Sequence, residues 1–110
     1  MADTEVRLDY LLDSLKDAFV FCDTGHVIRY MNSAARRRYE GRPAEVGRSI
    51  FDCHNEVSNE QIRAVCVRLF NGEDEVLITD DEKHRIFMRA VRDGDGAFIG
   101  YYERYEPPLR

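Results

Sequence analysis

Cys53 and His54 stand next to each other and are the pair in this chain best suited to chemistry. A cysteine thiolate is a strong nucleophile and an imidazole can take up its proton, so a small Cys/His enzyme is one hypothesis. Sequence neighbours rarely direct their side chains at each other, and the chain has no G-x-S-x-G, phosphate-loop or G-x-G-x-x-G motif. We therefore expect no enzymatic activity.

The histidines and cysteines also give little support for a metal site. Zinc sites draw on closely spaced ligands such as a C-x-x-C pair, and the chain has none. An odd number of widely spaced cysteines indicates reduced thiols rather than a disulfide framework. The residues concerned are His26, His54, His84, Cys22, Cys53 and Cys66. We expect no metal and a reducing, cytoplasmic setting.

Charge and composition restrict the possible partners. The 110 residues carry a formal net charge of −5 with 44% hydrophobic residues, which is typical of one soluble globular domain. An acidic surface repels phosphate backbones, so we expect no nucleic-acid binding. No apolar stretch reaches the roughly 18–20 residues that span a bilayer, so we expect no membrane segment. The run Arg36, Arg37 and Arg38 is either a local anion patch or one solvated helix face.

Two amphipathic helices are predicted to organise the chain. Residues 4–16 carry one leucine stripe at three- and four-residue steps, and so short a helix must pack on its own domain or on a second subunit. Residues 58–71 form the clearest helix, with Ser58 and Gln61 as a capping box and Gly72 beyond its end. Its buried face is expected to hold Ile62, Val65, Cys66, Leu69 and Phe70.

The remaining segments read as strands and one short helix. Residues 18–22 and 26–31 form a hairpin across Asp23-Thr24-Gly25, and Asn32 caps a helix over 33–39. Residues 43–54 read as short helices or a packed loop. Strands over 75–79, 84–92 and 97–106 end the chain. This order indicates an α+β fold, an antiparallel sheet with helices on one face. The second sheet face needs cover from the first helix or another subunit.

This ordered set resembles the PAS family over nearly the whole chain. The resemblance rests on the opening hairpin with its Asp-x-Gly turn, on Asn32-Ser33-Ala34-Ala35, on Gly47 before Ile50-Phe51, and on the Asp93-Gly94-Asp95-Gly96 hairpin. It implies a single domain over 1–110, with an N-terminal helix at 4–16 and a PAS core at 17–106. It also implies a five-stranded antiparallel sheet in the order 2-1-5-4-3.

The resemblance implies a sensor that dimerises and holds small ligands between the sheet and the long helix. The residues expected near that cavity are Tyr39, Phe51, His54, Val65, Cys66, Leu69, Met88 and Tyr101. They either line a ligand pocket or fill the space themselves. Haem-binding members often use a histidine of the long helix, and 58–71 contains none, which leaves His54 with Cys53 as the alternative ligand. The Asn-Cys-Arg-Phe motif of flavin light sensors is absent.

Four hypotheses follow for the function. The first is a PAS signalling domain that senses a small ligand and forms a homodimer through its first helix, by way of Leu8, Leu11, Leu12 and Leu15. The second is an interaction domain with a filled core that contacts a partner in trans. The third is a haem-binding gas or redox sensor that uses His54, and the fourth is the Cys/His enzyme. The identity of any ligand is not given by the sequence.

Overall fold

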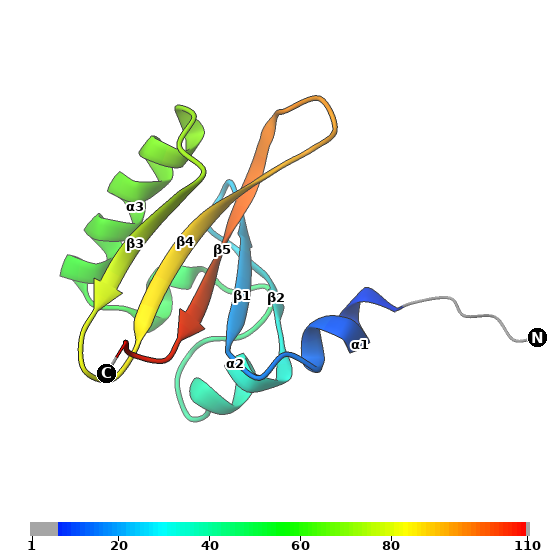
Figure 1. Cartoon of the computed structure of the whole chain (residues 1–110), viewed down its shortest axis with the longest axis vertical. Helices are drawn as coiled ribbons and strands as arrows, with labels where there is room; N and C mark the ends of the chain where they lie inside the picture. Colours follow the sequence, from blue (N-terminus) through cyan, green and yellow to red (C-terminus); the bar gives the residue numbers. More distant parts are fainter. Residues whose placement is uncertain (1–6, 110) are drawn as a thin grey trace, which may run out of the picture.

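The computed structural model describes residues 7–109, which form five strands and the helices that cover one of their faces (Figure 1). In chain order the elements are α1 (Leu8–Asp13), β1 (Phe19–Asp23), β2 (Ile28–Met31), α2 (Ser33–Arg38), the 3₁₀ helix η1 (Ile50–Cys53), α3 (Glu56–Phe70), β3 (Glu75–Asp80), β4 (Arg85–Arg92) and β5 (Phe98–Glu106). Residues 4–6, the start of the predicted N-terminal helix over 4–16, lie outside this range.

All strand pairs are antiparallel, and the sheet order is β2-β1-β5-β4-β3. This confirms the predicted α+β fold and its strand order. The last strand of the chain therefore occupies the middle of the sheet, between β1 and β4. A central strand is paired along both edges and covered on at least one face, so the side chains on its covered face lie deep in the interior.

The β1–β2 turn is fixed by Asp23, whose carboxylate accepts hydrogen bonds from the backbone N–H groups of Gly25 (2.9 Å) and Val27 (3.1 Å). The backbones of the neighbouring strands β1 and β5 also approach each other closely at Gly100. A Cβ atom at Gly100, where φ is 157°, would lie 2.4 Å from the carbonyl oxygen of Cys22. Glycine is the residue that permits so close a backbone approach.

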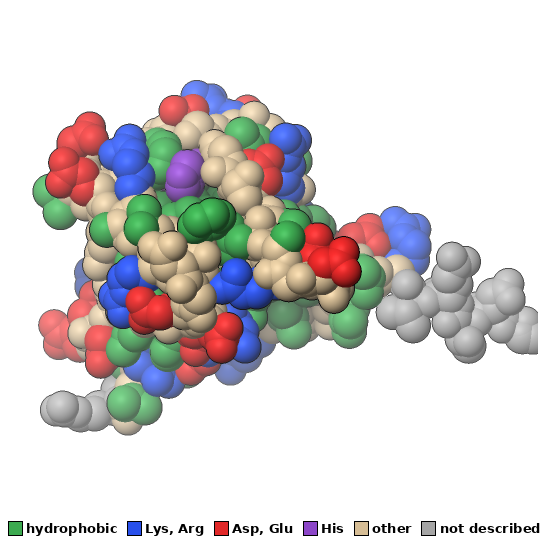
Figure 2. Space-filling model, turned by 90° about the horizontal axis from the view of Figure 1, so that it is seen from above, with side chains coloured by type: hydrophobic (Ala, Val, Ile, Leu, Met, Phe, Trp, Pro, Cys, Tyr) green, Lys and Arg blue, Asp and Glu red, His purple; other side chains and the backbone are tan. Residues whose placement is uncertain are grey.

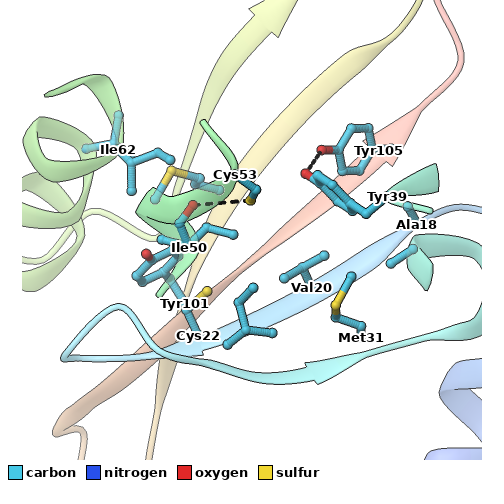
Figure 3. Packing of buried hydrophobic residues seen from close by; sticks show 14 of the residues in the cluster. Ala18, Val20, Cys22, Met31, Tyr39, Ile50, Cys53, Ile62, Tyr101 and Tyr105 are labelled. Carbon is cyan, nitrogen blue, oxygen red and sulfur yellow. Dashed lines mark hydrogen bonds between the residues drawn. The ribbon is translucent and has the colours of Figure 1, made fainter. Parts of the chain in front are cut away.

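Strand alternation separates a buried face from an open one. In β5, Tyr101, Glu103 and Tyr105 are buried, whereas Tyr102 and Arg104 on the opposite face are half-buried. The buried face meets α2, η1 and α3 in one core, part of which is shown in Figure 3. The members of that core are Ala18, Val20, Cys22, Ile28, Met31, Ala35, Tyr39, Ile50, Cys53, Ile62, Val65, Leu69, Met88, Tyr101 and Tyr105.

α3 differs from its prediction at both ends. It begins at Glu56 rather than at 58, because the Asn55 side chain accepts a hydrogen bond from the Ser58 N–H (2.8 Å) and is the N-cap. The predicted capping box is therefore wrong, and Gln61 instead donates to the carbonyl of Ile78 on β3. At the far end the prediction that Phe70 is buried is wrong: Phe70 is 67% exposed, whereas its neighbour Leu69 is fully buried, and the Phe70 ring lies edge-on to Phe98 with the centroids 6.1 Å apart.

The core face of α3 is otherwise as expected. Ile62, Val65 and Leu69 are buried, while Cys66 is only half-buried at the edge of the contact. The helix contacts β3, β4 and β5, and in Figure 1 it runs alongside β3. An amphipathic helix pressed onto an antiparallel sheet is thus the arrangement that encloses the interior.

α1 is shorter than predicted and does not cover the second sheet face. It ends at Asp13, so Leu15 follows the helix instead of belonging to it. Figure 1 shows α1 projecting beyond β2, and it packs against α2. Polar contacts hold it there: the Tyr30 hydroxyl donates to the Asp13 carboxylate (2.6 Å), and the Asn32 amide donates to the Leu12 carbonyl (3.0 Å).

Three of the four leucines predicted to form the dimer contact are left at the surface by this arrangement, and the fourth, Leu12, is half-buried. Leu8 is 69%, Leu11 53% and Leu15 44% exposed, and α1 has no buried residue. Over residues 7–109 no helix is both long and apolar enough to cross a membrane.

Candidate functional site

Glu103 is a carboxylic acid in the middle of the apolar core. It lies on β5, paired with Val20 of β1 and Met88 of β4, and it is 2% exposed. Its Oε1 atom accepts no hydrogen bond from the part of the chain that the structure describes. Burial raises the pKa of this carboxyl above its ordinary value, because the charged form loses its hydration there. The interior therefore favours the protonated, neutral acid.

Four other side chains lie near enough to interact electrostatically with this carboxyl, and together with it they form what we call the Glu103 cluster. Tyr105 and Tyr39 join their hydroxyls at 2.6 Å, and Figure 3 shows this bond between β5 and the end of α2. Cys53 at the end of η1 and His54 directly after it reach the same region, and the interaction with His54 opposes the rise in the Glu103 pKa. The cluster thus joins the central strand to both short helices.

The cysteine and histidine of the cluster do touch, contrary to the expectation for sequence neighbours. Cys53 Sγ lies 3.2 Å from His54 Nδ1. Both atoms also contact the carbonyl oxygen of Ile50, at 3.2 Å from Sγ and 2.9 Å from Nδ1. A carbonyl only accepts, so Nδ1 carries a hydrogen and cannot take the thiol proton. Burial raises the pKa of the Cys53 thiol to about 11. This geometry therefore does not produce a thiolate nucleophile at neutral pH.

A second contact set lies at the other end of the core and is built on a strained backbone. His26 has φ of 65°, a left-handed conformation that costs a residue with a Cβ about 1–2 kcal/mol. This places its Nδ1 atom 2.9 Å from the Tyr101 hydroxyl and its ring 4.7 Å from that of Phe51. Partial burial lowers the pKa of His26, with Arg63 as the next cause. The neutral imidazole is therefore favoured beside Tyr101.

A surface groove leads to this second set. It has a volume of about 610 Å³ and runs between α3, the β1–β2 turn and the start of β5. Figure 2 shows this end of the molecule, where apolar side chains gather around a histidine. The lining residues are Thr24, His26, Arg63, Cys66, Val67, Phe70 and Phe98. Because His26 lines the groove and contacts Tyr101, the groove adjoins the core.

The eight predicted cavity residues fall into three groups. Tyr39, Val65, Leu69, Met88 and Tyr101 are buried, at most 5% exposed, and belong to one core. Phe51 and His54 are half-buried beside that core, and Cys66 is the one member that lines the groove. The structure thus brings the set together around one interior, and packs most of it side chain against side chain.

A haem does not fit this packing. One feature is favourable: His54 Nδ1 donates to a carbonyl, which is how axial imidazoles are commonly oriented. The available space is unfavourable, because Tyr39, Val65 and Met88 are packed into the continuous core. A porphyrin would have to displace these side chains. Across residues 7–109, no group of three His, Cys, Asp or Glu residues gathers to hold a metal ion.

Three residues of the site were not predicted from the sequence. Tyr105 and Glu103 follow Tyr101 at two-residue steps, so strand alternation alone would have placed all three on one face. A glutamate at such a position is an unusual signal, since ionisable residues are rarely buried without a partner. The role of His26 depends on the distant Tyr101, and no local pattern indicates that contact.

Comparison with known proteins places this geometry in a family. The model of the PAS domain family matches residues 8–105. No curated protein matches. Among solved structures, a C-terminal domain from Streptococcus mutans is 23% identical, with a TM-score of 0.76, covering 91% of this chain and 81% of that one.

Two further structures have the same fold. A sensory box sensor histidine kinase from Vibrio cholerae is 18% identical with a TM-score of 0.68, and covers 91% of this chain and 87% of that one. The PAS domain of BvgS from Bordetella pertussis is 12% identical with a TM-score of 0.72, and covers 94% of this chain and 85% of that one. The family match spans the hairpin, both core helices and the three closing strands, and this chain belongs to the PAS domain family.

Proposed function

We propose that this chain is a sensory PAS domain that binds a small ligand between α3 and the sheet and works as a homodimer through α1. PAS domains are typical of sensor and signal-transduction proteins, and they are generally sensory or interaction modules rather than enzymes. The proposal goes further by giving the ligand a polar anchor, Glu103. The free thiols Cys22, Cys53 and Cys66 support a reducing, cytoplasmic setting.

The unpartnered carboxyl of Glu103 is the observation that carries the ligand proposal. A buried polar atom without a hydrogen bond costs about 1–3 kcal/mol, so such groups are rare unless a function retains them. Asn59 on α3 is a second buried case, since its Oδ1 accepts nothing among the described residues while its amide donates to the Phe51 carbonyl. Asn59 Oδ1 is an acceptor, and the neutral Glu103 carboxyl can accept through its carbonyl oxygen. A ligand with hydrogen-bond donors matches them.

The groove beside His26 supplies a route from the surface. Its wall includes Cys66 and Phe70 of α3, and its inner end adjoins Tyr101, which lies two residues from Glu103 on the same face of β5. Movement of the exposed end of α3 would connect the groove to the carboxyl. A ligand of this class is a small, mainly apolar molecule with one or two donor groups.

A filled-core interaction domain is the second candidate, because a specific observation favours it. Five of the eight expected cavity residues pack into the continuous core, as they would in a domain that has no ligand. In that case the Glu103 cluster would only specify the packing of the core. The two candidates differ in whether Glu103 responds to small molecules.

A ligand screen with a matched pair of variants separates these candidates. The wild-type chain, Glu103→Gln and Glu40→Gln would be screened by thermal shift against small donor-bearing molecules. At 100 times its Kd, a ligand adds about 2.7 kcal/mol to the free energy of unfolding. We expect hits that raise the Tm of wild type and Glu40→Gln and lose most of this effect in Glu103→Gln. A complete absence of hits, or hits indifferent to Glu103, would favour the filled core. An absorption spectrum of the purified chain tests the haem alternative.

The dimer proposal rests on the exposed leucines of α1 and of the segment directly after it. Leu8, Leu11 and Leu15 are about half or more exposed, although α1 itself is held by polar bonds to Tyr30 and Asn32. Full burial of one leucine contributes about 1.5–3 kcal/mol. A second copy of the same stripe would bury these side chains on both partners.

Light scattering coupled to size exclusion tests the dimer. We expect a dimer for the wild-type chain and a monomer for Leu8→Asp with Leu11→Asp. The matched control is Val46→Asp with Val57→Asp, at positions outside the groove where the side chains are 58% and 79% exposed. A monomeric wild type, or a control that dissociates equally, would contradict the role of α1.

A further inference from the structure

A hollow at the opposite end of the sheet from the groove collects positive charge. Its volume is about 450 Å³, and it lies where α2, the β3–β4 turn, the segment before β1 and the end of β5 meet. These segments lie together at the lower end of the sheet in Figure 1. The side chains that matter here are Lys16, Arg37, Arg38, Lys83, His84 and Tyr105. Four permanent cations from three separate parts of the chain therefore surround one hollow.

These four cations have no carboxylate partners among residues 7–109, whereas most other arginines in that range do. Arg36, the first residue of the arginine run, pairs with Asp13 at 3.5 Å. Ten such pairs occupy arginines elsewhere in the described chain, but none involves Lys16, Arg37, Arg38 or Lys83. In a chain of net charge −5, an unpaired group of four cations is a strong local departure from the average.

Arg38 is held in place before any ligand arrives. Its guanidinium lies 4.1 Å from the centre of the Tyr105 ring, and its Nη2 donates to His84 Nδ1 at 3.2 Å. An arginine only donates, so Nδ1 of His84 accepts. Fixing a long side chain in advance lowers the entropy lost on binding. The guanidinium also keeps further N–H groups for an anion, which it can grip in a bidentate manner.

The nearby acidic groups are engaged elsewhere. Glu106 lines the hollow but pairs with Arg85 at 2.8 Å and with Arg104. Asp81 accepts hydrogen bonds from the backbone N–H groups of Lys83 and His84, and it lines a different hollow beside Pro108 and Leu109. Asp17 is the remaining acidic residue of the basic hollow. The balance of the lining charges stays positive.

We propose that this hollow is a second binding site, for a small ligand that carries a phosphoryl dianion. Phosphoryl oxygens match the fork of Arg38 and the point charges of Lys83 and Lys16. The volume lies within the range of small-molecule sites, about 300–1,000 Å³. An acidic protein with one basic hollow selects a compact anion rather than a nucleic-acid backbone. The site shares Tyr105 with the Glu103 cluster but does not use the Glu103 carboxyl, which is absent from its lining.

NMR titration of the full chain with inorganic phosphate and pyrophosphate tests the proposal, at constant ionic strength kept with chloride. We expect saturable shifts of amides in α2 and the β3–β4 turn, with pyrophosphate binding more tightly than phosphate. Arg37→Ala with Lys83→Ala should weaken pyrophosphate binding at least about tenfold, because charged hydrogen bonds are lost. Arg38→Lys should also weaken it, since the bidentate fork is removed. Arg48→Ala, an exposed arginine paired with Asp52, is the control and should bind as wild type.

Each outcome of the titration either supports the site or overturns it. Shifts that do not saturate, shifts that the Arg37/Lys83 variant leaves unchanged, or an equal loss in Arg48→Ala would each overturn the site. Glu103→Gln should bind pyrophosphate as well as wild type. Failure of the interior-ligand proposal would therefore leave this one standing, and failure here would leave the interior site untouched.

Discussion

Replacing Glu103 by glutamine should change how stability depends on pH. The carboxyl is 2% exposed and burial raises its pKa in the folded chain, whereas in the unfolded chain it ionises with an ordinary value near 4.3. Above that pH the folded state binds one proton more than the unfolded state. The free energy of unfolding therefore falls as the pH rises, until the pH passes the pKa of the folded state.

The size of this effect follows from linkage alone. While Glu103 is protonated when folded and ionised when unfolded, wild type loses about 1.4 kcal/mol per pH unit, or about 2.7 kcal/mol over two units. Glutamine has nearly the same shape and does not titrate. The difference between Glu103→Gln and wild type should thus widen in favour of the variant as the pH rises above about 5.

Urea unfolding at a series of pH values measures this difference. A change of 1.4 kcal/mol corresponds to about 6 °C in Tm for a domain of this size, so thermal melts give an independent reading. Glu40→Gln, at an exposed position, should follow wild type. Parallel curves for wild type and Glu103→Gln would refute the reasoning, because they would mean that folding does not alter the proton affinity of this carboxyl.

Three further predictions concern the frame around the site. Asn32 is fully buried, accepts hydrogen bonds from the N–H groups of Phe19 and Ala35, and donates to the carbonyls of Leu12 and Asp17. Asn32→Ala should lower the free energy of unfolding in urea by about 3 kcal/mol, because the helix loses its cap and the bonded groups lose their partner. Gly100→Ala should lower the free energy of unfolding by about 3 kcal/mol, because its Cβ would clash with the Cys22 carbonyl. Gly94→Ala has open space and should change it by no more than about 0.5 kcal/mol. Equal losses would contradict the close approach of β1 and β5 at Gly100. Cys53, 6% exposed with its pKa raised to about 11, should react with a thiol reagent only after unfolding, and rapid labelling of the native chain would revive the enzyme hypothesis.

The strands could be predicted from the sequence because their signals are local, and the order of the strands in the sheet was implied by the resemblance to PAS domains. Turn residues such as Asp23 and Gly25, the helix cap Asn32 and the period-two strands fix the elements, and the order of elements narrows the topology. The same kind of signal misled at α3. Ser58 with Gln61 has the spacing of a capping box, but Asn55 offers an equally good cap one turn earlier and takes the role.

The interior could be predicted only in outline. Five of the expected cavity residues share the core, because their apolar character and spacing both point inward. Glu103 was missed because a glutamate in a strand is normally assigned to the solvent face, although its two-residue step from Tyr101 and its register with Val20 and Met88 place it inside. The contact of His26 with Tyr101 joins positions 75 residues apart, and a single sequence carries no signal for it.

The position of a bound molecule tests the sensor account most directly. A crystal structure of the chain with the tightest hit of the thermal-shift screen should place a ligand donor within about 3 Å of the Glu103 carboxyl, between α3 and β5. A ligand seated elsewhere, with Glu103 still enclosed by Tyr39, Tyr105 and the core, would contradict the assignment of this carboxyl as the sensing group.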